Sequence, residues 1–398
     1  MPMLLAYTLA AITISSRFEG GSTGPVEQTA PHHFRVAVAG EADQDKRNRQ
    51  ASWYYFQIDG AKGRALTIEL TNLVGEYNYK SGTHAVTKNT RPVWSEDNRT
   101  WRHFETVEWD DAKKELRLRL TPRTNRLWIA HAPPYTTVHL QALLGHVRQH
   151  KGVRVESIGQ TVGGREIPLI SINEGATPKP VIWLMARQHS WETGTSWMTD
   201  AGLRWLLSSD AQAKRLREGV IWKIFPMADP DGCARGGVRY NANGYDLNRN
   251  WDKIDAQRMP EIAAQRKAML AWLDSGRQIN LFLTLHNQEN HDHVEGPMTL
   301  GGVTFGLLGH ALYNGLKQQT SFWSKLDGPR DMAASTTPGQ QGRMNVVQGL
   351  FAERKVPAFL LETSVEAVET LHRPRTVEDW RAFGRGLFRV LYDSAMIE

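Results

Sequence analysis

The chain has 398 residues, which is too long for one ordinary single-core domain and too short for three, so we expect two domains. Hydrophobic residues make up 40% and charged residues 23%, which excludes a mainly disordered, collagenous or membrane-embedded chain. The net charge of +6 favours an acidic partner. Beyond the short cluster at 46–49 there is no basic run, which argues against a nucleic-acid partner.

The single cysteine and the apolar N-terminal residues indicate the cellular compartment. Cys233 alone excludes an intramolecular disulfide and a cysteine-rich zinc site, and it agrees with a reducing, cytoplasmic location. No Lys or Arg precedes the apolar residues 1–14, so we interpret 9–16 as a first β-strand rather than a secretory signal. No apolar run reaches the roughly 18 residues of a spanning helix, so no membrane partner is expected.

The N-terminal third has the pattern of a β-sandwich. Apolar or alternating runs predict strands at 53–58, 65–70, 116–120 and 127–129, and Gly, Asn, Asp and Pro separate them. Half-buried strands of this kind pack most simply as two antiparallel sheets. We therefore expect an N-terminal domain at 1–140.

The remainder, 141–398, has the pattern of an α/β domain. A connecting helix is predicted at 137–149 and two strands within 153–172. Buried strands follow at 181–186, 220–227, 279–285 and 356–361, and amphipathic helices at 193–207, 260–273, 305–319 and 377–392. This alternation predicts a sheet covered by helices on both faces.

Titratable side chains follow the carboxyl ends of these strands, where open α/β sheets bind ligands. The first strand leads to His189 and Glu192, the third to His286 and the fourth to Glu362. A single histidine there is most often structural, but the joint occurrence predicts a site. Two histidines and one glutamate, with an open fourth position, are typical of a hydrolytic zinc site.

These residues resemble the zinc metallocarboxypeptidases. His189-x-x-Glu192, His286, Glu362 and the segment GYDLNRNW at 244–251 carry the likeness. The DPDG segment at 229–232 followed by Arg239, the strand WYYF at 53–56 and the IAHAPPYT junction at 129–136 are similar to the cytosolic carboxypeptidase branch. The resemblance implies a carboxypeptidase-like mixed sheet with helices on both faces, preceded by a small antiparallel β-sandwich.

The resemblance also implies a catalytic apparatus. His189, Glu192 and His286 would hold one zinc ion, and Glu362 would act as general base. Arg239 would stabilise the oxyanion, with Arg235 as the competing candidate.

Further positions would bind the substrate. Asn248 and Arg249 would hold the α-carboxylate of the last residue, because a guanidinium can bind a carboxylate through two parallel hydrogen bonds. Asp246 would orient a zinc-bound histidine from behind. Arg343, in the partly matching GQQGR segment at 339–343, is the candidate for an acidic side chain. For Asp246 and Arg343 the alternatives are a turn residue and a structural arginine.

Two features depart from the family pattern. Residues 324–361 contain no tyrosine where the family places a substrate-contacting one, so that contact is absent or comes from elsewhere, for example from Tyr313. The loop after His286 also contains His291 and His293, which we interpret as exposed loop residues rather than as metal ligands.

The resemblance therefore implies a cytoplasmic zinc carboxypeptidase that acts on the C-terminus of peptides or proteins and releases glutamate or aspartate. One alternative is a zinc amidohydrolase for a small acylated amino acid or a cell-wall peptide. Another is a binding module that has kept the fold without the activity. The sequence does not indicate an oligomeric state.

Overall fold

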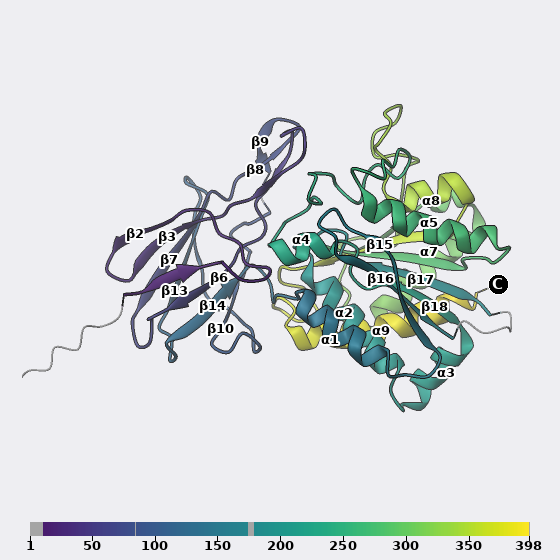
Figure 1. The fold of residues 1–398 in the computed structure, drawn as a ribbon, viewed down its shortest axis with the longest axis horizontal. Coiled ribbons are helices and arrows are strands. Elements are labelled where there is room, and N and C mark those ends of the chain that lie inside the picture. The colour runs from purple at the N-terminus through teal and green to yellow at the C-terminus, as the bar shows by residue number, and fades with distance from the viewer. Residues whose placement is uncertain (1–10, 84, 174–178, 398) are drawn as a thin grey trace, which may run out of the picture.

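The computed structural model describes residues 11–83, 85–173 and 179–397. An all-β region and an α/β region lie side by side, and the chain enters the second after about a third of its length (Figure 1). Of the strand predicted at 9–16, residues 9 and 10 lie outside the described residues, and β1 spans Thr13–Ser15.

The all-β region is a sandwich of two sheets. In the described residues the first sheet has the order β1-β6-β14-β10-β11 and the second the order β12-β13-β7-β3-β2. The four strands predicted from the sequence are β6 (Tyr55–Asp59), β7 (Leu66–Thr71), β13 (Glu115–Leu120) and β14 (Arg126–Ala130). Their inward side chains, among them Phe56, Ile68 and Leu118, form a common buried core. Most neighbours pair antiparallel, but β3 (His33–Ala37) runs parallel to β7.

Other strands of this region escaped the sequence analysis because they are short or lack an apolar alternation. They are β2 (Val26–Ala30), β10 (Val93–Ser95), β11 (Arg102–His103) and β12 (Glu108–Asp110). A further small sheet contains β4 (Glu41–Ala42), β5 (Arg49–Gln50), β8 (Gly75–Tyr77) and β9 (Lys80–Thr83). Figure 1 shows the β8–β9 hairpin projecting from the sandwich beside the α/β region.

The α/β region is built on one mixed sheet. Among the described residues its order is β15-β16-β18-β17-β19-β22-β20-β21. The strands are β15 (Val153–Gln160), β16 (Glu166–Ile172), β17 (Val181–Ala186), β18 (Ile221–Phe225), β19 (Leu281–Gln288), β20 (His293–Gly296), β21 (Arg330–Asp331) and β22 (Ala358–Ser364). The central strands β18, β17, β19 and β22 are parallel and buried on both faces, which explains their continuous apolar sequences.

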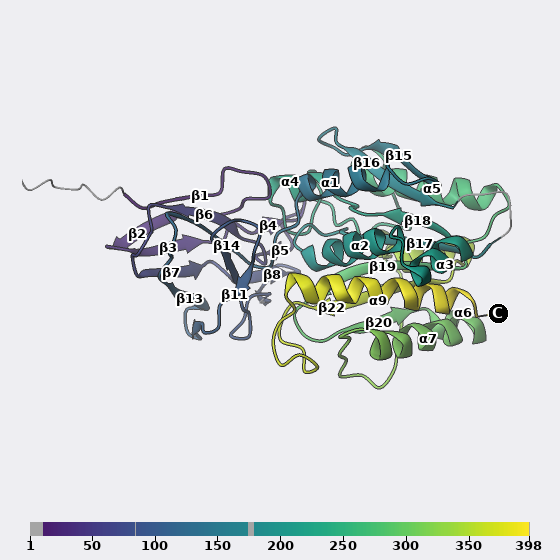
Figure 2. The same cartoon turned by 90° about the horizontal axis from the view of Figure 1, so that it is seen from below.

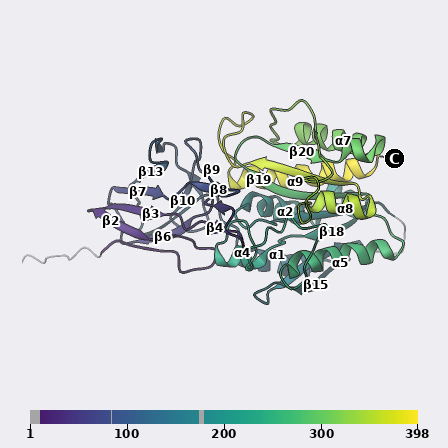
Figure 3. The ribbon, with the colours of Figure 1, turned by 90° about the horizontal axis from the view of Figure 1, so that it is seen from above.

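Helices cover both faces of this sheet, as the sequence predicts. One face packs against α1 (Thr137–Val147), α2 (Thr193–Leu206), α3 (Ala211–Gly219), α7 (Val303–Gln319) and α9 (Val377–Ala395). Figure 2 shows α2, α3 and α9 on this side. The other face packs against α5 (Pro260–Asp274) and α8 (Val346–Arg354), which lie over the sheet in Figure 3. The short helices α4 (Pro230–Arg235) and α6 (Met298–Gly301) complete the region.

No helix within the described ranges has both the length and the apolar character needed to span a bilayer.

A buried ion pair joins the loops at one end of the sheet. The guanidinium of Arg375 donates to both carboxylate oxygens of Asp292, at 3.0 Å and 2.5 Å, and both side chains are fully buried. The same carboxylate accepts the backbone N–H groups of Ser364 and Trp323. Asp292 therefore holds together segments that follow the strands of His286 and Glu362.

We expect the substitution Asp292→Ala to lower the free energy of unfolding by about 3–5 kcal/mol, because it leaves the guanidinium of Arg375 buried without its partner. Chemical denaturation measures the change. Asp111→Ala is the control, since the ion pair of Asp111 with Lys114 is exposed and should leave the denaturation midpoint unchanged. Equal midpoints for the two variants would contradict the expectation.

Candidate active site

The turn between β17 and α2 carries His189 and Glu192. Its first residue, Arg187, has a left-handed backbone (φ 63°) and is buried. The Arg187 guanidinium donates to the carbonyl of Ser190 at 2.9 Å and 2.6 Å, and to the hydroxyl of Ser196 at 2.9 Å. These bonds hold a backbone conformation that costs free energy in isolation, so Arg187 fixes the shape of this turn.

Strand register brings the other two residues to the same edge. His286 lies on β19 and Glu362 on β22, and the two are direct partners in the parallel ladder. Strand β17 lies on the other side of β19, so the turn with His189 and Glu192 follows next to His286. The structure thus brings together all four residues that the sequence placed at strand ends.

Three metal donors converge. The carboxylate of Glu192 lies between the rings of the two histidines, at 2.7 Å from His189 Nδ1 and 3.0 Å from His286 Nδ1. One ligand atom from each residue lies within 4.8 Å of the other two, and all three side chains are buried. In the described part of the chain no other group of three His, Cys, Asp or Glu side chains meets this condition.

The second nitrogen of each ring has its own partner. His189 Nε2 lies 3.1 Å from Asp246 Oδ1, and His286 Nε2 lies 3.1 Å from Thr284 Oγ1. A proton on Nε2 leaves the Nδ1 lone pair free to bind a metal ion beside Glu192, which is the tautomer that a metal ligand needs. The donor set therefore fits a single zinc ion.

Each of the three donors has a pKa displaced from its ordinary value. Burial alone would raise the pKa of Glu192, but the two imidazoles outweigh it and lower that pKa. Burial likewise opposes protonation of His189, yet the carboxylates of Glu192 and Asp246 raise its pKa. For His286 burial prevails and lowers the pKa.

Glu362 has the environment of a proton-transfer group. Its Oε2 atom is buried and has no hydrogen-bond partner among the described residues. Burial, and then the negative charge of Glu192, raise the pKa of Glu362 well above its ordinary value. A divalent cation beside it would oppose this shift and favour the ionised form.

Asp246 connects the metal donors to Arg239. Its second oxygen, Oδ2, accepts from Arg239 Nε at 2.8 Å. Burial would raise the pKa of Asp246, but the Arg239 guanidinium and the ring of His189 hold it well below its ordinary value. Asp246 is thus ionised and contacts both His189 and Arg239.

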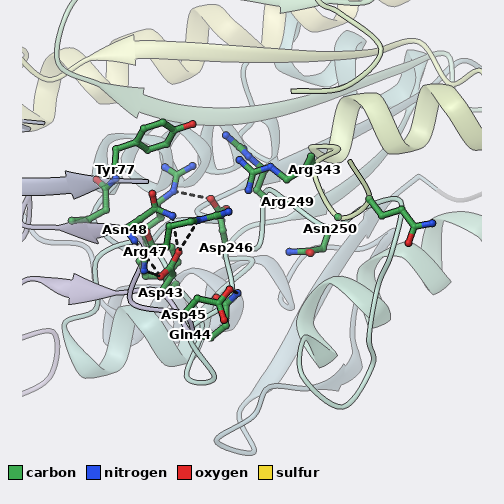
Figure 4. Close-up of a pocket in the computed structure, with 15 residues that line it drawn as sticks. Asp43, Gln44, Asp45, Arg47, Asn48, Tyr77, Asp246, Arg249, Asn250 and Arg343 are labelled. Carbon is green, nitrogen blue, oxygen red and sulfur yellow. Dashed lines mark hydrogen bonds and ion pairs between the residues drawn. The ribbon is translucent and has the colours of Figure 1, made fainter. Parts of the chain in front are cut away.

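A cavity of about 380 Å³ opens beside Asp246 (Figure 4). Both regions of the chain line it. The α/β region contributes Arg239, Tyr240, Asp246, Arg249, Asn250, Gln341, Gly342 and Arg343, and the small sheet with its turns contributes Asp43, Gln44, Asp45, Arg47, Asn48, Gln50 and Tyr77.

Two arginines of this cavity lack acidic partners. No carboxylate of the described residues lies within ion-pair distance of Arg249 or Arg343, and among these residues the Arg249 guanidinium donates only to the carbonyl of Asn248, at 2.8 Å. Burial, together with the nearby cations Arg239 and Arg343, lowers the pKa of Arg249. Such an arrangement favours an anionic ligand.

Asn248 lies deeper, between the cavity and the metal donors. Its Oδ1 accepts the backbone N–H of Val346 at 3.1 Å, and its Nδ2 lies 3.3 Å from His286 Nε2. If His286 carries its proton on Nε2, that proton is donated to Thr284, whose hydroxyl donates to Gln188. Asn248 Nδ2 then has no acceptor on this ring and can donate to a ligand.

The other residues that the sequence analysis considered for the active site do not line the cavity. Arg235 forms an ion pair with Glu41 and does not line the cavity. Tyr313 is buried on α7, and its hydroxyl donates to the carbonyl of Leu326, so it does not reach the cavity. His293 is buried at the start of β20, so the expectation of an exposed loop residue is wrong for it, and its Nδ1 contacts the Gln288 side chain. His291 is half-buried and contacts the Asp292 carbonyl.

The sequence analysis missed Tyr77, a residue of the N-terminal region that lies in the cavity. Figure 4 shows its hydroxyl directed into the cavity on the side of Arg249. Tyr77 lies on the three-residue strand β8, more than 160 positions from Arg249, and no local pattern marks it.

Comparisons with known families match both regions. The zinc carboxypeptidase family model matches residues 140–291. The model of the cytosolic carboxypeptidase N-terminal domain matches residues 14–131.

Individual relatives agree with these matches. An uncharacterised protein of Zymomonas mobilis is 30% identical over 284 residues, which cover 71% of this chain and 69% of that protein. Cytosolic carboxypeptidase 1 of Gallus gallus is 27% identical over 308 residues, 68% of this chain, and cytosolic carboxypeptidase 3 of Bos taurus is 23% identical over 304 residues, 71% of this chain. The matches cover 25% and 30% of the length of these two relatives.

Solved structures share the fold over almost the whole chain. A metallo-carboxypeptidase from Burkholderia cenocepacia has a TM-score of 0.84 at 22% identity, covering 97% of this chain and 99% of that one. A metallo-carboxypeptidase from Pseudomonas aeruginosa has a TM-score of 0.81 at 22% identity, covering 96% and 100%. The α/β fold with a preceding β-sandwich, predicted from the sequence, is confirmed.

We expect Asp246→Asn to weaken zinc binding by about 10- to 100-fold, because the neutral amide orients and polarises His189 less well than the carboxylate. Competition with a chelator of known affinity measures the dissociation constant. Asp255→Asn is the matched control, since Asp255 caps an exposed turn. An unchanged zinc affinity in Asp246→Asn would show that Asp246 does not support the metal site.

Proposed function

The chain belongs to the zinc carboxypeptidase family, and from this premise we propose that it removes C-terminal residues from peptides or proteins, with a preference for glutamate and aspartate. The observation that carries the proposal is the cavity with Arg249 and Arg343, which Asp246 joins to the three metal donors. A C-terminal residue bound there would present its peptide bond to the metal site.

His189, Glu192 and His286 would hold the zinc ion, which supplies a Lewis acid for the scissile carbonyl and acidifies water. Glu362 would accept a proton from the attacking water at Oε2 and pass it to the leaving amine. The lack of a protein partner at Oε2 leaves that atom free for both transfers.

Arg239 would stabilise the negative charge that develops on the carbonyl oxygen. Its Nε is bound to Asp246, which fixes the side chain and leaves the terminal nitrogens for the oxyanion. Arg235 is less suited to this role because Glu41 occupies it.

Arg249 would hold the free α-carboxylate of the substrate, with a second hydrogen bond from Asn248 Nδ2. A planar guanidinium without an acidic partner is the group that binds a carboxylate best. This requirement for a free terminal carboxylate would make the enzyme an exopeptidase.

Arg343 would bind an acidic side chain of the terminal residue. Arg249 and Arg343 repel each other in the absence of a ligand. A terminal glutamate or aspartate brings two carboxylates and so offers one to each guanidinium. Tyr77, whose hydroxyl points into the same cavity, would contribute a further polar contact.

The proposal also includes the domain organisation and the location of the chain. We propose a domain boundary at residue 140, supported by the two family matches on either side of it. We propose a cytoplasmic location, supported by the lone buried Cys233 and by the names of the cytosolic relatives. Fractionation of the source cells checks the location.

The first test uses peptides that end in Glu, Asp, Lys, Leu or an amidated Glu, incubated with zinc-loaded protein and analysed by mass spectrometry. We expect stepwise loss of terminal Glu or Asp, no loss from the amide, and no cleavage by Glu362→Gln with zinc still bound. Zinc binding without cleavage of any free-carboxylate peptide would instead favour an amidohydrolase for small acylated amino acids. A protein that binds no zinc would be a non-catalytic module.

The second test addresses the acidic preference. We expect Arg343→Ala to reduce kcat/KM for a Glu-terminated peptide by about 10- to 100-fold, the usual effect of losing a charged hydrogen bond. A Leu-terminated peptide should be affected little. Arg354→Ala is the control, because Arg354 pairs with Asp274 on α8 and α5. Equal losses on both peptides would contradict a role for Arg343 in side-chain selection.

A further inference from the structure

The loop that carries Arg239 is bound to a carboxylate from the N-terminal region. Glu41, on β4, accepts three consecutive backbone N–H groups at Oε2: Val238 at 2.9 Å, Arg239 at 2.5 Å and Tyr240 at 2.8 Å. Its other oxygen forms an ion pair with Arg235. The Glu41 side chain is 11% exposed, so these bonds lie largely out of water, where charge-assisted hydrogen bonds are strong.

Without Glu41, the buried N–H groups of this loop would have few other acceptors. Val238 and Tyr240 are almost fully buried, and a buried N–H without an acceptor costs free energy. The same loop touches the metal turn, because the carbonyl of Val238 accepts from Trp191 N at 3.0 Å. A shift of the loop would therefore displace Arg239 relative to His189 and Glu192.

Several hydrogen bonds hold the hairpin that carries Glu41. Asp43 is buried and closes the β4–β5 turn by accepting the backbone N–H groups of Arg47 and Asn48 at 2.7 Å and 3.2 Å. Arg49 then ties the hairpin to the sandwich through the carbonyls of Val74 and Ala39 at 2.7 Å and 3.1 Å. These bonds tie the segment that carries Glu41 to the rest of the N-terminal region.

A second bond joins the same turn to the substrate-binding segment. Gln44 N donates to the carbonyl of Gly244 at 3.0 Å. Gly244 has a left-handed backbone (φ 83°), and a Cβ there would lie 2.8 Å from Gln44 N, so only glycine allows this approach. Gly244 lies two residues before Asp246, and the Tyr240–Asp246 bridge connects it to the Arg239 loop.

We propose that Glu41 is a positioning residue for Arg239, by which the N-terminal region sets the geometry of the oxyanion site. This inference rests on the proposed function, because it assigns Glu41 an effect on the catalysed step. Glu41 does not line the cavity. It acts through the backbone of residues 238–240.

A double-mutant cycle tests this with the Glu-terminated peptide and zinc-loaded protein. We expect Glu41→Ala to lower kcat by about 10- to 100-fold, as expected for a misplaced catalytic group. KM should change by less than about 3-fold and zinc content should not change. Arg239→Ala should lower kcat by about 100- to 1000-fold. The double variant should match Arg239→Ala alone within about 3-fold, because Glu41 acts only through Arg239.

Two further variants serve as controls for the cycle. Glu41→Gln keeps an oxygen acceptor for the three N–H groups, so its kcat should be much closer to the wild-type value than that of Glu41→Ala. Glu27→Gln, on the exposed strand β2, should match the wild type. Losses that multiply in the double variant, or a parallel loss of zinc, would overturn the proposal and leave Glu41 a purely structural role.

Hydrogen exchange provides a measurement that does not depend on activity. In Glu41→Ala the amides of residues 238–240 should exchange at least about 10-fold faster than in the wild type, since they lose their acceptor. Unchanged exchange would refute the positioning contact. If the wild type cleaves no peptide, the proposed function fails, and the exchange result alone then decides whether Glu41 holds this loop.

Discussion

The structure depends on the burial of Glu192 between the Nδ1 atoms of His189 and His286. A buried carboxylate is costly unless positive charge and hydrogen-bond donors surround it. The two imidazoles compensate part of this cost. The three donors lie within 4.8 Å of one another, and a divalent cation among them would compensate the remaining negative charge. The unusual backbone of Arg187 and the carboxylate of Asp246 both serve to hold this group in place.

The parallel core of the sheet makes such a cluster possible. Because β17, β19 and β22 are neighbours with their carboxyl ends at one edge, residues that follow each strand meet without any long loop. The direct pairing of His286 with Glu362 adds a second carboxylate at the distance of one strand spacing from His286. Chemistry at this edge therefore follows from strand order and register.

This also explains which parts were predictable from the sequence. Continuous apolar runs revealed the buried strands, and the polar residues after them revealed His189, Glu192, His286 and Glu362. Strands β4, β5 and β8 have two or three residues each, too few for a periodic pattern, so Glu41 and Tyr77 gave no signal. Their partners lie more than 160 positions away, and only the tertiary fold brings them together. The same limit led to Tyr313 as a candidate for the missing phenol, because the sequence could not show that this residue packs inside α7.

Asp246 connects the metal donors and the Arg239 loop in one hydrogen-bond network. One of its oxygens contacts His189 and the other accepts from Arg239, so a single carboxylate links the metal donors to the Arg239 loop. The backbone of Arg239 is in turn bound by Glu41, and the segment before Asp246 is bound by Gln44. Residues so connected should show energetic coupling rather than independent effects. The small sheet of the N-terminal region thus contacts both the Arg239 loop and the segment before Asp246, which are the two segments that the proposed function assigns to the developing charge and to the substrate.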